Sequence, residues 1–204
     1  NSADPNFPFL TDAADDIASG DLPGGINVLD DIWIGKDEGR AMLQIIHDVA
    51  PGANLAFHTA NGGTAKYAQG IAELSNAGAD VIVDDIRLFD EPMFQDGLIA
   101  QAVDSVVADG VSYFASAGNY GRLSYENAFS PSGQFLPNVN GELHDFDPSS
   151  RVDTLQQITI PANTGFTASF QWDSPLFSVS GGSGSPNNLN IYLFDITTAK
   201  AVRT

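Results

Sequence analysis

The sequence predicts an α/β fold, in which helices flank a parallel sheet, followed by a C-terminal all-β module of the sandwich type. Short apolar runs alternate with segments of helical spacing between residues 25 and 119. After about Asp147 helical spacing is absent, and threonine, aromatic and branched residues dominate. The chain has 204 residues and is 43% hydrophobic, which suffices for one good-sized core or two modest ones.

The apolar spacing predicts each helix and strand of the α/β region in turn. Three segments carry apolar residues at helical intervals: 40–49, 64–76 and 96–108. Their ends are followed by Pro51-Gly52, Gly78 and Gly110, as is typical of helix termination. Four short apolar runs are the expected strands: 26–29, 55–57, 80–83 and 111–115. Strands joined by helices of this length indicate a parallel sheet with right-handed crossovers.

The C-terminal region is set apart by its composition. Its expected strands lie at 152–160, 165–172 and 189–196, and the stretch 180–188 consists of turn-forming residues. The stretch from Tyr120 is rich in glycine, proline, asparagine and serine, which is typical of a long connection. We therefore expect an α/β domain at 1–130, a connection at 131–148 and a sandwich-like module at 149–204. In that module Trp172, Tyr192 and Phe194 could form either a stacking platform or a portion of a core.

The charge balance excludes several classes of partner. The chain has 8 basic and 26 acidic residues, for a formal net charge of -18. Such a surface repels phosphate backbones and anionic lipids, so we expect neither a nucleic-acid nor a membrane partner. The absence of cysteine excludes disulfides and thiolate chemistry. Nothing in the sequence predicts an oligomeric state.

Polar residues follow each expected strand of the parallel sheet. Ligands gather at the carboxyl ends of such strands, so these residues are the first candidates for a site. They are Asp30-Asp31, His58-Thr59, Asp84-Asp85 and Ser116-Ala117-Gly118-Asn119.

Two segments resemble the subtilisin-like serine peptidases. In the first, Asp-Glu-Gly-Arg-Ala-Met at 37–42 opens a helix, which leads into Val-Ala-Pro-Gly-Ala-Asn-Leu at 49–55. Glu38 and Gly39 fall where this family has its base histidine and the following glycine. The second segment, Phe-Ala-Ser-Ala-Gly-Asn at 114–119, matches the family's Ala-Gly-Asn strand end. The resemblance covers roughly residues 20 to 120 and implies a partial subtilisin-like fold and a secreted protein.

The resemblance implies a serine-type endopeptidase that hydrolyses peptide bonds through an acyl-enzyme. Glu38 would be the base, Asn119 the oxyanion donor and Asp85 the partner carboxylate. The nucleophilic serine would lie outside this chain, because the family's Gly-Thr-Ser motif is absent. A peptide or protein substrate would lie along Ile86, Arg87, Ala117 and Gly118. The related sedolisins also use a glutamate base, but Met42 stands where their supporting aspartate would fall.

Other interpretations stay open. Glu38 could serve only as an acid that favours a helix N-terminus, and His58 is an alternative base. The missing base histidine also fits an inactive pseudo-peptidase that binds extracellular proteins or glycans. We expect no cofactor and no catalytic metal. An acidic loop could hold a structural calcium ion through the side chains of Glu142, Asp145 and Asp147, beside His144.

Overall fold

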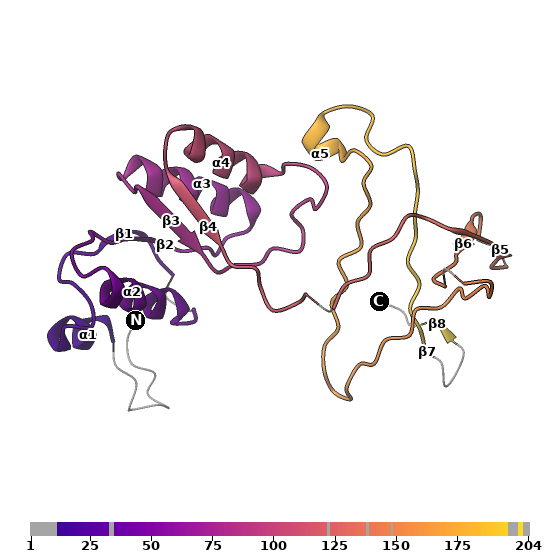
Figure 1. Ribbon diagram of the computed structural model, residues 1–204, viewed down its shortest axis with the longest axis horizontal. Coiled ribbons are helices and arrows are strands. Elements are labelled where there is room, and N and C mark those ends of the chain that lie inside the picture. Colours follow the sequence, from indigo (N-terminus) through magenta and orange to yellow (C-terminus); the bar gives the residue numbers. More distant parts are fainter. Residues whose placement is uncertain are drawn as a thin grey trace. The chain divides into compact units, whose positions relative to one another are not determined.

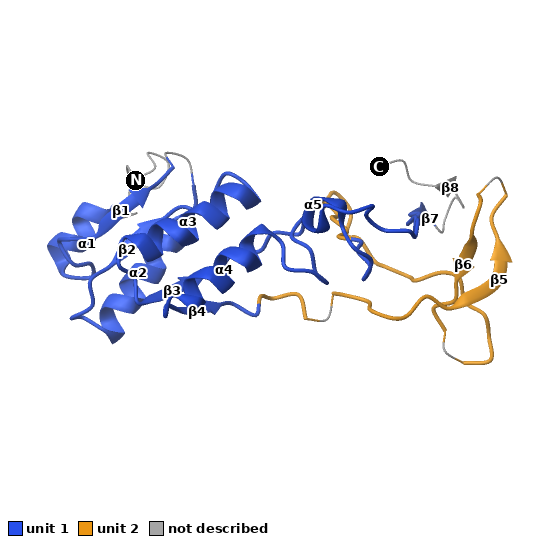
Figure 2. Ribbon diagram, turned by 90° about the horizontal axis from the view of Figure 1, so that it is seen from above, with its two compact units in different colours: residues 1–117, 170–204 blue, residues 118–169 orange. Residues whose placement is uncertain are grey.

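The computed structural model of the chain describes residues 12–32, 35–121, 123–137, 139–147, 149–195 and 200–201. The chain forms two compact units, which Figure 2 draws in different colours. The first unit combines residues 1–117 with residues 170–204, and the second unit is formed by residues 118–169. The first unit therefore contains nearly the whole stretch in which the sequence predicts alternating strands and helices.

Helices and strands alternate along the first 117 residues, as Figure 1 shows. The α/β prediction is confirmed, and α3 begins and ends at the predicted residues. β1, β2 and β3 each begin and end one residue later than the predicted runs, and their ladders pair Asp30 with His58 and Asp84 with Ala115. The elements are α1 (Ala13–Ser19), β1 (Asn27–Asp30), α2 (Glu38–Val49), β2 (Ala56–His58), α3 (Thr64–Asn76), β3 (Val81–Asp84), α4 (Leu98–Ala108) and β4 (Ser112–Ala115).

Helix α1 has no counterpart among the predicted elements. Asp12 accepts hydrogen bonds from the backbone of Ala14 and Asp15, and the Asp15 side chain accepts one from the backbone of Asp12. This reciprocal capping box satisfies amides that a helix N-terminus leaves without partners. Gly20 ends the helix with a φ of 93°, in the left-handed region that favours glycine. The sequence signals that could have predicted this helix are the acids Asp12 and Asp15, spaced as in a capping box, and Gly20 at its end.

The four strands form two separate parallel pairs rather than one sheet. β1 pairs with β2, and β3 pairs with β4. Among the described residues no ladder joins β2 to β3, although α3 contacts both strands. The prediction is correct about the parallel pairing and wrong in joining all strands. Apolar periodicity reveals strands, but it carries no information about which strand edges approach within the ~4.8 Å that a ladder needs.

Helices α2 and α3 cover opposite faces of the β1–β2 pair. The Phe57 ring packs against Gly39 of α2 so closely that an added Cβ would lie 2.5 Å from its Cε2. The His58 ring packs against Gly70 of α3, where an added Cβ would lie 2.5 Å from its Nδ1. Successive residues of a strand point to opposite faces, so the two helices lie on the two sides of the pair. The contact of Phe57 with α2 and the contact of His58 with α3 therefore lie on opposite faces of the β1–β2 pair.

The β3–β4 pair is covered on one face only in the described portion of the chain. Its covered face holds the main core, which consists of Ile71, Ile82, Val106 and Val111. On the other face Val81, Val83 and Phe114 are 56%, 45% and 58% exposed. Parallel sheets ordinarily have both faces covered, so this second face is an unusual exposure of apolar side chains.

Two glutamines, Gln171 and Gln95, connect the C-terminal segment of the first unit to the loop before α4, and Gln95 Oε1 accepts from the Leu176 amide over 2.7 Å. Gln171 Oε1 accepts from the Met93 amide over 2.9 Å, and its Nε2 donates to the carbonyls of Phe89 and Glu91 over 3.3 Å and 3.0 Å. These contacts tie the segment that begins at Phe170 to the loop before α4. Three short elements follow it: α5 (Phe177–Ser180), β7 (Phe194–Asp195) and β8 (Lys200–Ala201).

The all-β prediction is met only by short strands. Residues 152–160 and 165–172 contain no strand, and the predicted run at 189–196 contains only β7 in its described portion. Isolated strand-like sequences do not form strands without partner edges, and two-stranded pairs are marginal by themselves. The sandwich therefore stays a prediction.

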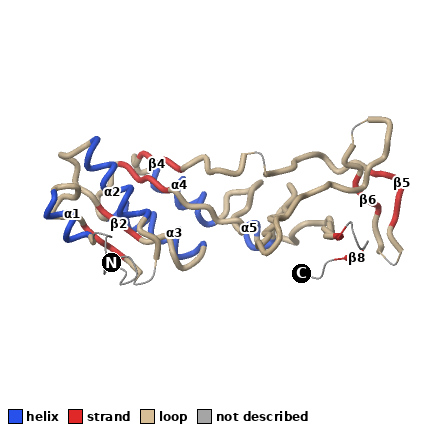
Figure 3. Tube along the Cα trace, turned by 90° about the horizontal axis from the view of Figure 1, so that it is seen from below, coloured by secondary structure: helices blue, strands red, loops and turns tan. Residues whose placement is uncertain are grey.

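The second unit contains one antiparallel pair, β5 (Pro131–Phe135) and β6 (Glu142–His144), between long loops (Figure 3). The pair falls in the predicted connection. Tyr125, His144 and Phe146 gather beside it, with ring centroids 4.6 Å apart for His144 and Phe146. Throughout the described residues of both units, no helix has the length and apolar character that crossing a membrane requires.

Candidate active site at the strand ends

The carboxyl ends of β3 and β4 lie side by side because the two strands pair in register. Asp84 is opposite Ala115, and the Ser116 amide donates to the Asp84 carbonyl over 3.2 Å. The residues next in the chain, Asp85 and Ala117, therefore leave the pair at the same edge. Both are exposed, so this edge is accessible to a ligand in the first unit.

The residues predicted to contact substrate continue from these strand ends. Ile86 is 44% exposed, and the Arg87 guanidinium lies 4.4 Å from the centre of the Phe89 ring. Gly118 has a φ of 67°, which side-chain-bearing residues seldom adopt. Gly118 and Asn119 open the second unit, whereas Glu38 belongs to the first. The approach of Asn119 to Glu38 therefore stays a prediction.

The two adjacent acids at the end of β3 have different surroundings. Asp84 is half-buried and accepts a hydrogen bond from the Tyr113 hydroxyl, which lies 3.5 Å from the Tyr67 hydroxyl. Burial raises the pKa of Tyr113, and the hydrogen bond to Asp84 adds to the rise. Burial likewise raises the pKa of Tyr67. Both phenols therefore stay protonated as donors, and Asp85 is the exposed carboxylate that remains at this edge.

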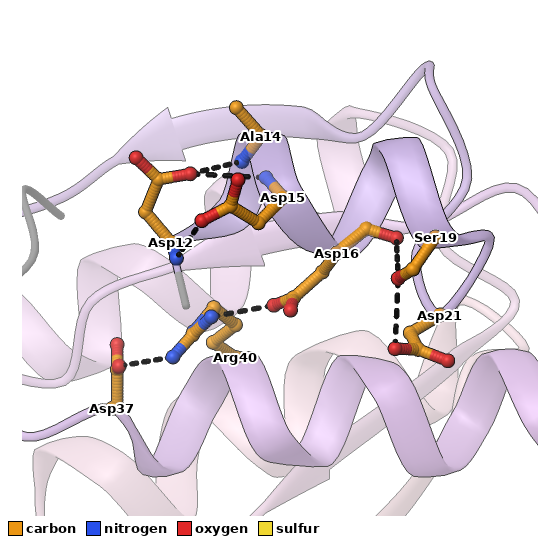
Figure 4. A network of polar contacts seen from close by, with 8 residues as sticks. All are labelled: Asp12, Ala14, Asp15, Asp16, Ser19, Asp21, Asp37 and Arg40. Atoms are coloured by element: carbon orange, nitrogen blue, oxygen red, sulfur yellow. Dashed lines mark hydrogen bonds and ion pairs between the residues drawn. The ribbon is translucent and has the colours of Figure 1, made fainter. Parts of the chain in front are cut away.

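Glu38 is the first residue of α2, and its side chain is exposed. The start of this helix is fixed by Arg40, as Figure 4 shows. Nη1 of Arg40 donates to Asp16 of α1 and Nη2 donates to Asp37, each over 2.5 Å. Burial opposes the charge of Arg40, but the hydrogen bonds that it donates to Asp37 and Asp16 outweigh this effect and raise the pKa of Arg40. Through these two contacts, Arg40 connects α1 to the turn that carries Glu38.

One helical turn after Glu38, α2 presents Met42, which is half-buried. A thioether neither accepts a proton from glutamate nor carries charge, so α2 itself supplies no supporting carboxylate at that position. The neighbouring Asp37 is engaged by Arg40. A carboxylate partner for Glu38 would therefore have to come from another element, and Asp85, which is exposed, stays the predicted partner.

His58, the alternative base, lies inside the first unit. Its side chain is 3% exposed and forms a 3.1 Å contact with Glu73 of α3. A base must reach the hydroxyl that it deprotonates, and a buried ring does not reach a substrate at the surface. Nearby, Lys66 donates to Asp30 and lowers the pKa of that carboxyl. Sequence analysis missed Lys66 and Glu73, although a seven-residue interval places both on one face of a helix.

The acidic loop of the second unit directs its side chains to its own backbone. Glu142 accepts from the Gly133 amide, and Asp145 accepts from the amides of Asp147 and Asp153. The Ser149 amide donates to Asp147 and lowers the pKa of that carboxyl. Within the described ranges no three histidine, cysteine, aspartate or glutamate side chains form a metal-binding group.

A cavity of about 280 Å³ lies in the C-terminal segment of the first unit. Trp172 is tilted against Phe170, with ring centroids 5.6 Å apart, and its Nε1 donates to the Ser185 hydroxyl over 3.1 Å. The cavity therefore combines aromatic faces with polar groups. It is lined by Asp90, Phe170, Gln171, Trp172, Ser174, Leu176 and Ser185.

Comparison with known proteins adds no assignment. No family model matches the chain, and no curated protein or solved structure is significantly similar to it. The candidate site therefore depends on the residues and contacts of this chain alone.

Proposed function

We propose that these residues belong to a serine-type endopeptidase that resembles the subtilisins in fold and uses a glutamate as its base. Glu38 carries this proposal, because it is an exposed carboxylate at the first residue of a helix whose start is fixed by Arg40. Its place in the sequence is the place of the base histidine in the resembling family. A fixed and accessible carboxylate is what general-base catalysis requires.

The chemistry is an acyl transfer in two halves. A serine outside this chain attacks the peptide carbonyl, and its hydroxyl proton passes to the Glu38 carboxylate as the Oγ–C bond forms. The same proton then passes to the leaving amine as the C–N bond breaks. Water attacks the resulting ester, gives its proton to Glu38, and the serine leaves with that proton as the acid product forms. Glu38 thus ends each half of the reaction as it began.

The remaining residues stabilise and position the substrate in this proposal. The amide of Asn119 donates to the oxyanion that forms at the carbonyl carbon. Asp85 supports the base from the end of β3. Ile86 and Arg87 continue one strand and Ala117 and Gly118 continue its neighbour, so an extended peptide could lie along these segments in the manner of an added strand. We also propose export from the cell, on the resemblance alone.

The test uses the full-length protein that contains these residues, with a peptide substrate and a serine-directed phosphonate probe. Glu38→Gln should lower the turnover rate by about 10²–10⁴-fold, because the base is lost. Asn119→Ala should lower it by about 10²–10³-fold, because an oxyanion donor is lost. Glu126→Gln, a charge-matched control at an exposed position, should leave the rate unchanged.

Either of two results with the full-length protein would overturn the proposal. One is full activity in Glu38→Gln, and the other is absence of covalent probe labelling in an active preparation. The isolated chain of 204 residues should hydrolyse nothing, because its nucleophile lies elsewhere. Turnover by this chain that survives Glu38→Gln would also contradict the assignment.

A second function, glycan binding by an inactive relative of such enzymes, is favoured by the cavity beside Trp172. Aromatic faces stack on sugar rings, and the carboxylate of Asp90 and the hydroxyl of Ser174 line the same space. Binding of the chain to a glycan array, lost in Trp172→Ala, together with no probe labelling of the full-length protein, would favour this function. A full-length protein with probe labelling and no glycan binding would exclude it.

A further inference from the structure

His58 has an oxygen acceptor next to each nitrogen of its ring. The side chain is 3% exposed, at the carboxyl end of β2. Its Nδ1 lies 2.8 Å from the main-chain carbonyl oxygen of Thr59, and its Nε2 lies 3.1 Å from Oε2 of Glu73. A carbonyl oxygen only accepts, so Nδ1 must carry a hydrogen. An ionised carboxylate also only accepts, so Nε2 must carry one as well.

Both oxygens of the Glu73 carboxylate are placed to accept hydrogen bonds. The Glu73 side chain is 40% exposed, so the carboxylate keeps some of its hydration. Its second oxygen accepts from Nε2 of Gln69 over 2.6 Å. A ring that donates from both nitrogens to such partners is the imidazolium cation.

The charges around His58 balance only when its ring is charged. Asp30 of β1 places Oδ2 4.0 Å from Nε2 of the ring, and Lys66 of α3 donates to the same Asp30 oxygen over 2.5 Å. With Glu73, the group then contains two cations and two carboxylates. A neutral His58 would leave it with one excess negative charge, in a chain whose formal net charge is already -18. That background also attracts a proton.

We propose that His58 is a proton-dependent latch between β2 and α3. When the ring loses a proton, one of its two acceptors loses a hydrogen bond and the group becomes net negative. Gly70 lies against the ring without room for even a Cβ, so the ring has no free space on that side of α3. The β2–α3 contact then weakens whenever the ring gives up its proton, because Glu73 or the Thr59 carbonyl is left without its donor. This inference does not depend on the proposed peptidase activity.

Nitrogen-15 NMR of the histidine-labelled chain tests the protonation directly. At about pH 6, where histidine can carry either charge, both ring nitrogens of His58 should bear hydrogen. His144 is an internal reference, because its Nδ1 lies 3.0 Å from the Ser130 amide and accepts from it. His144 should therefore show one bare nitrogen in the same spectrum. A His58 ring with a single protonated nitrogen at this pH would overturn the proposal.

Amide hydrogen exchange tests the latch. After correction for the intrinsic effect of pH, amides of β2 and α3 should exchange about tenfold faster near pH 8 than near pH 6, the effect of losing one hydrogen bond to a charged group. The amides of β5 and β6 should show no such change. Glu73→Gln should remove the pH dependence, whereas the control Glu126→Gln should retain it. Equal corrected rates at both pH values, or an unchanged dependence in Glu73→Gln, would refute the latch; if Glu73→Gln does not fold, the wild-type spectrum decides.

Discussion

Replacing Arg40 by methionine should strongly destabilise the first unit, because it leaves a buried carboxylate without its partner. Asp16 has a side chain that is 3% exposed, and Arg40 donates to it over 2.5 Å. Breaking a buried ion pair by removing one partner costs about 3–5 kcal/mol. Methionine keeps much of the length of the side chain, so lost packing contributes little. We expect Arg40→Met to lower the free energy of unfolding by an amount within that range.

The second partner of Arg40 provides the contrast. Asp37 lies at the same 2.5 Å distance, but its side chain is 43% exposed. Solvent screens an exposed pair, so Asp37→Ala should cost no more than about 1 kcal/mol. Two contacts of equal length to one guanidinium are therefore expected to differ severalfold in free energy, and burial is the reason.

Urea unfolding followed by the helical circular dichroism signal measures both effects, since every described helix belongs to the first unit. The double variant Arg40→Met with Asp16→Leu removes both charges and should recover most of the lost stability, as replaced buried pairs often do. A cost below about 1 kcal/mol for Arg40→Met, or no recovery in the double variant, would refute the assignment of Asp16 as a buried charge that depends on Arg40.

Two further predictions concern the β3–β4 pair. Ile82→Ala should lower the free energy of unfolding by about 2–5 kcal/mol in the same urea assay, because Ile82 is 4% exposed in the main core, whereas Val81→Ala at a 56% exposed position should cost far less. The raised pKa values of Tyr113 and Tyr67 keep both phenols protonated in the folded chain above about pH 10, where unfolded tyrosines lose their protons, so stability should fall as pH rises through that range. Tyr113→Phe should reduce that alkaline loss, and an equal loss in the variant would contradict the burial of these hydroxyls.

The sequence predicted the regular elements of the first unit because their signals are local. The apolar face of α3 repeats at helical intervals and Gly78 follows its end, so its bounds needed no knowledge of its neighbours. Helix α1 was missed because only seven residues form it and its caps are acids, which also occur in loops. Asp16 also ties this helix to Arg40, through a contact between residues 24 positions apart that no local pattern contains.

The sequence suggested which residues to consider for the candidate site, but it did not predict their contacts or their burial. Strand ends drew attention to Asp84 and Asp85, but only the contact with Tyr113 distinguishes the engaged acid from the exposed one. His58 was chosen for its chemistry, whereas its burial depends on Gly70, which follows it by 12 positions and leaves the space that the ring fills. The predicted strands of the C-terminal region depended on long-range pairing that their strand propensity does not contain. Among the described residues of these runs, only β7 has a partner strand, β8.

The residues of the two proposals, Glu38 as a base and His58 as a latch, belong to opposite faces of the β1–β2 pair. On one face Phe57 meets Gly39, next to Glu38, through a contact that contains no titrating group. On the other face His58 meets α3 through charges that must balance. Glu38→Gln removes the proposed base and leaves the contacts of His58 unchanged, whereas Glu73→Gln changes a partner of His58 and leaves Glu38 unchanged. Because Glu73→Gln alters only the second face, it should change the amide exchange of β2 and α3 and leave peptide hydrolysis by the full-length protein unchanged, so failure of one proposal leaves the other standing.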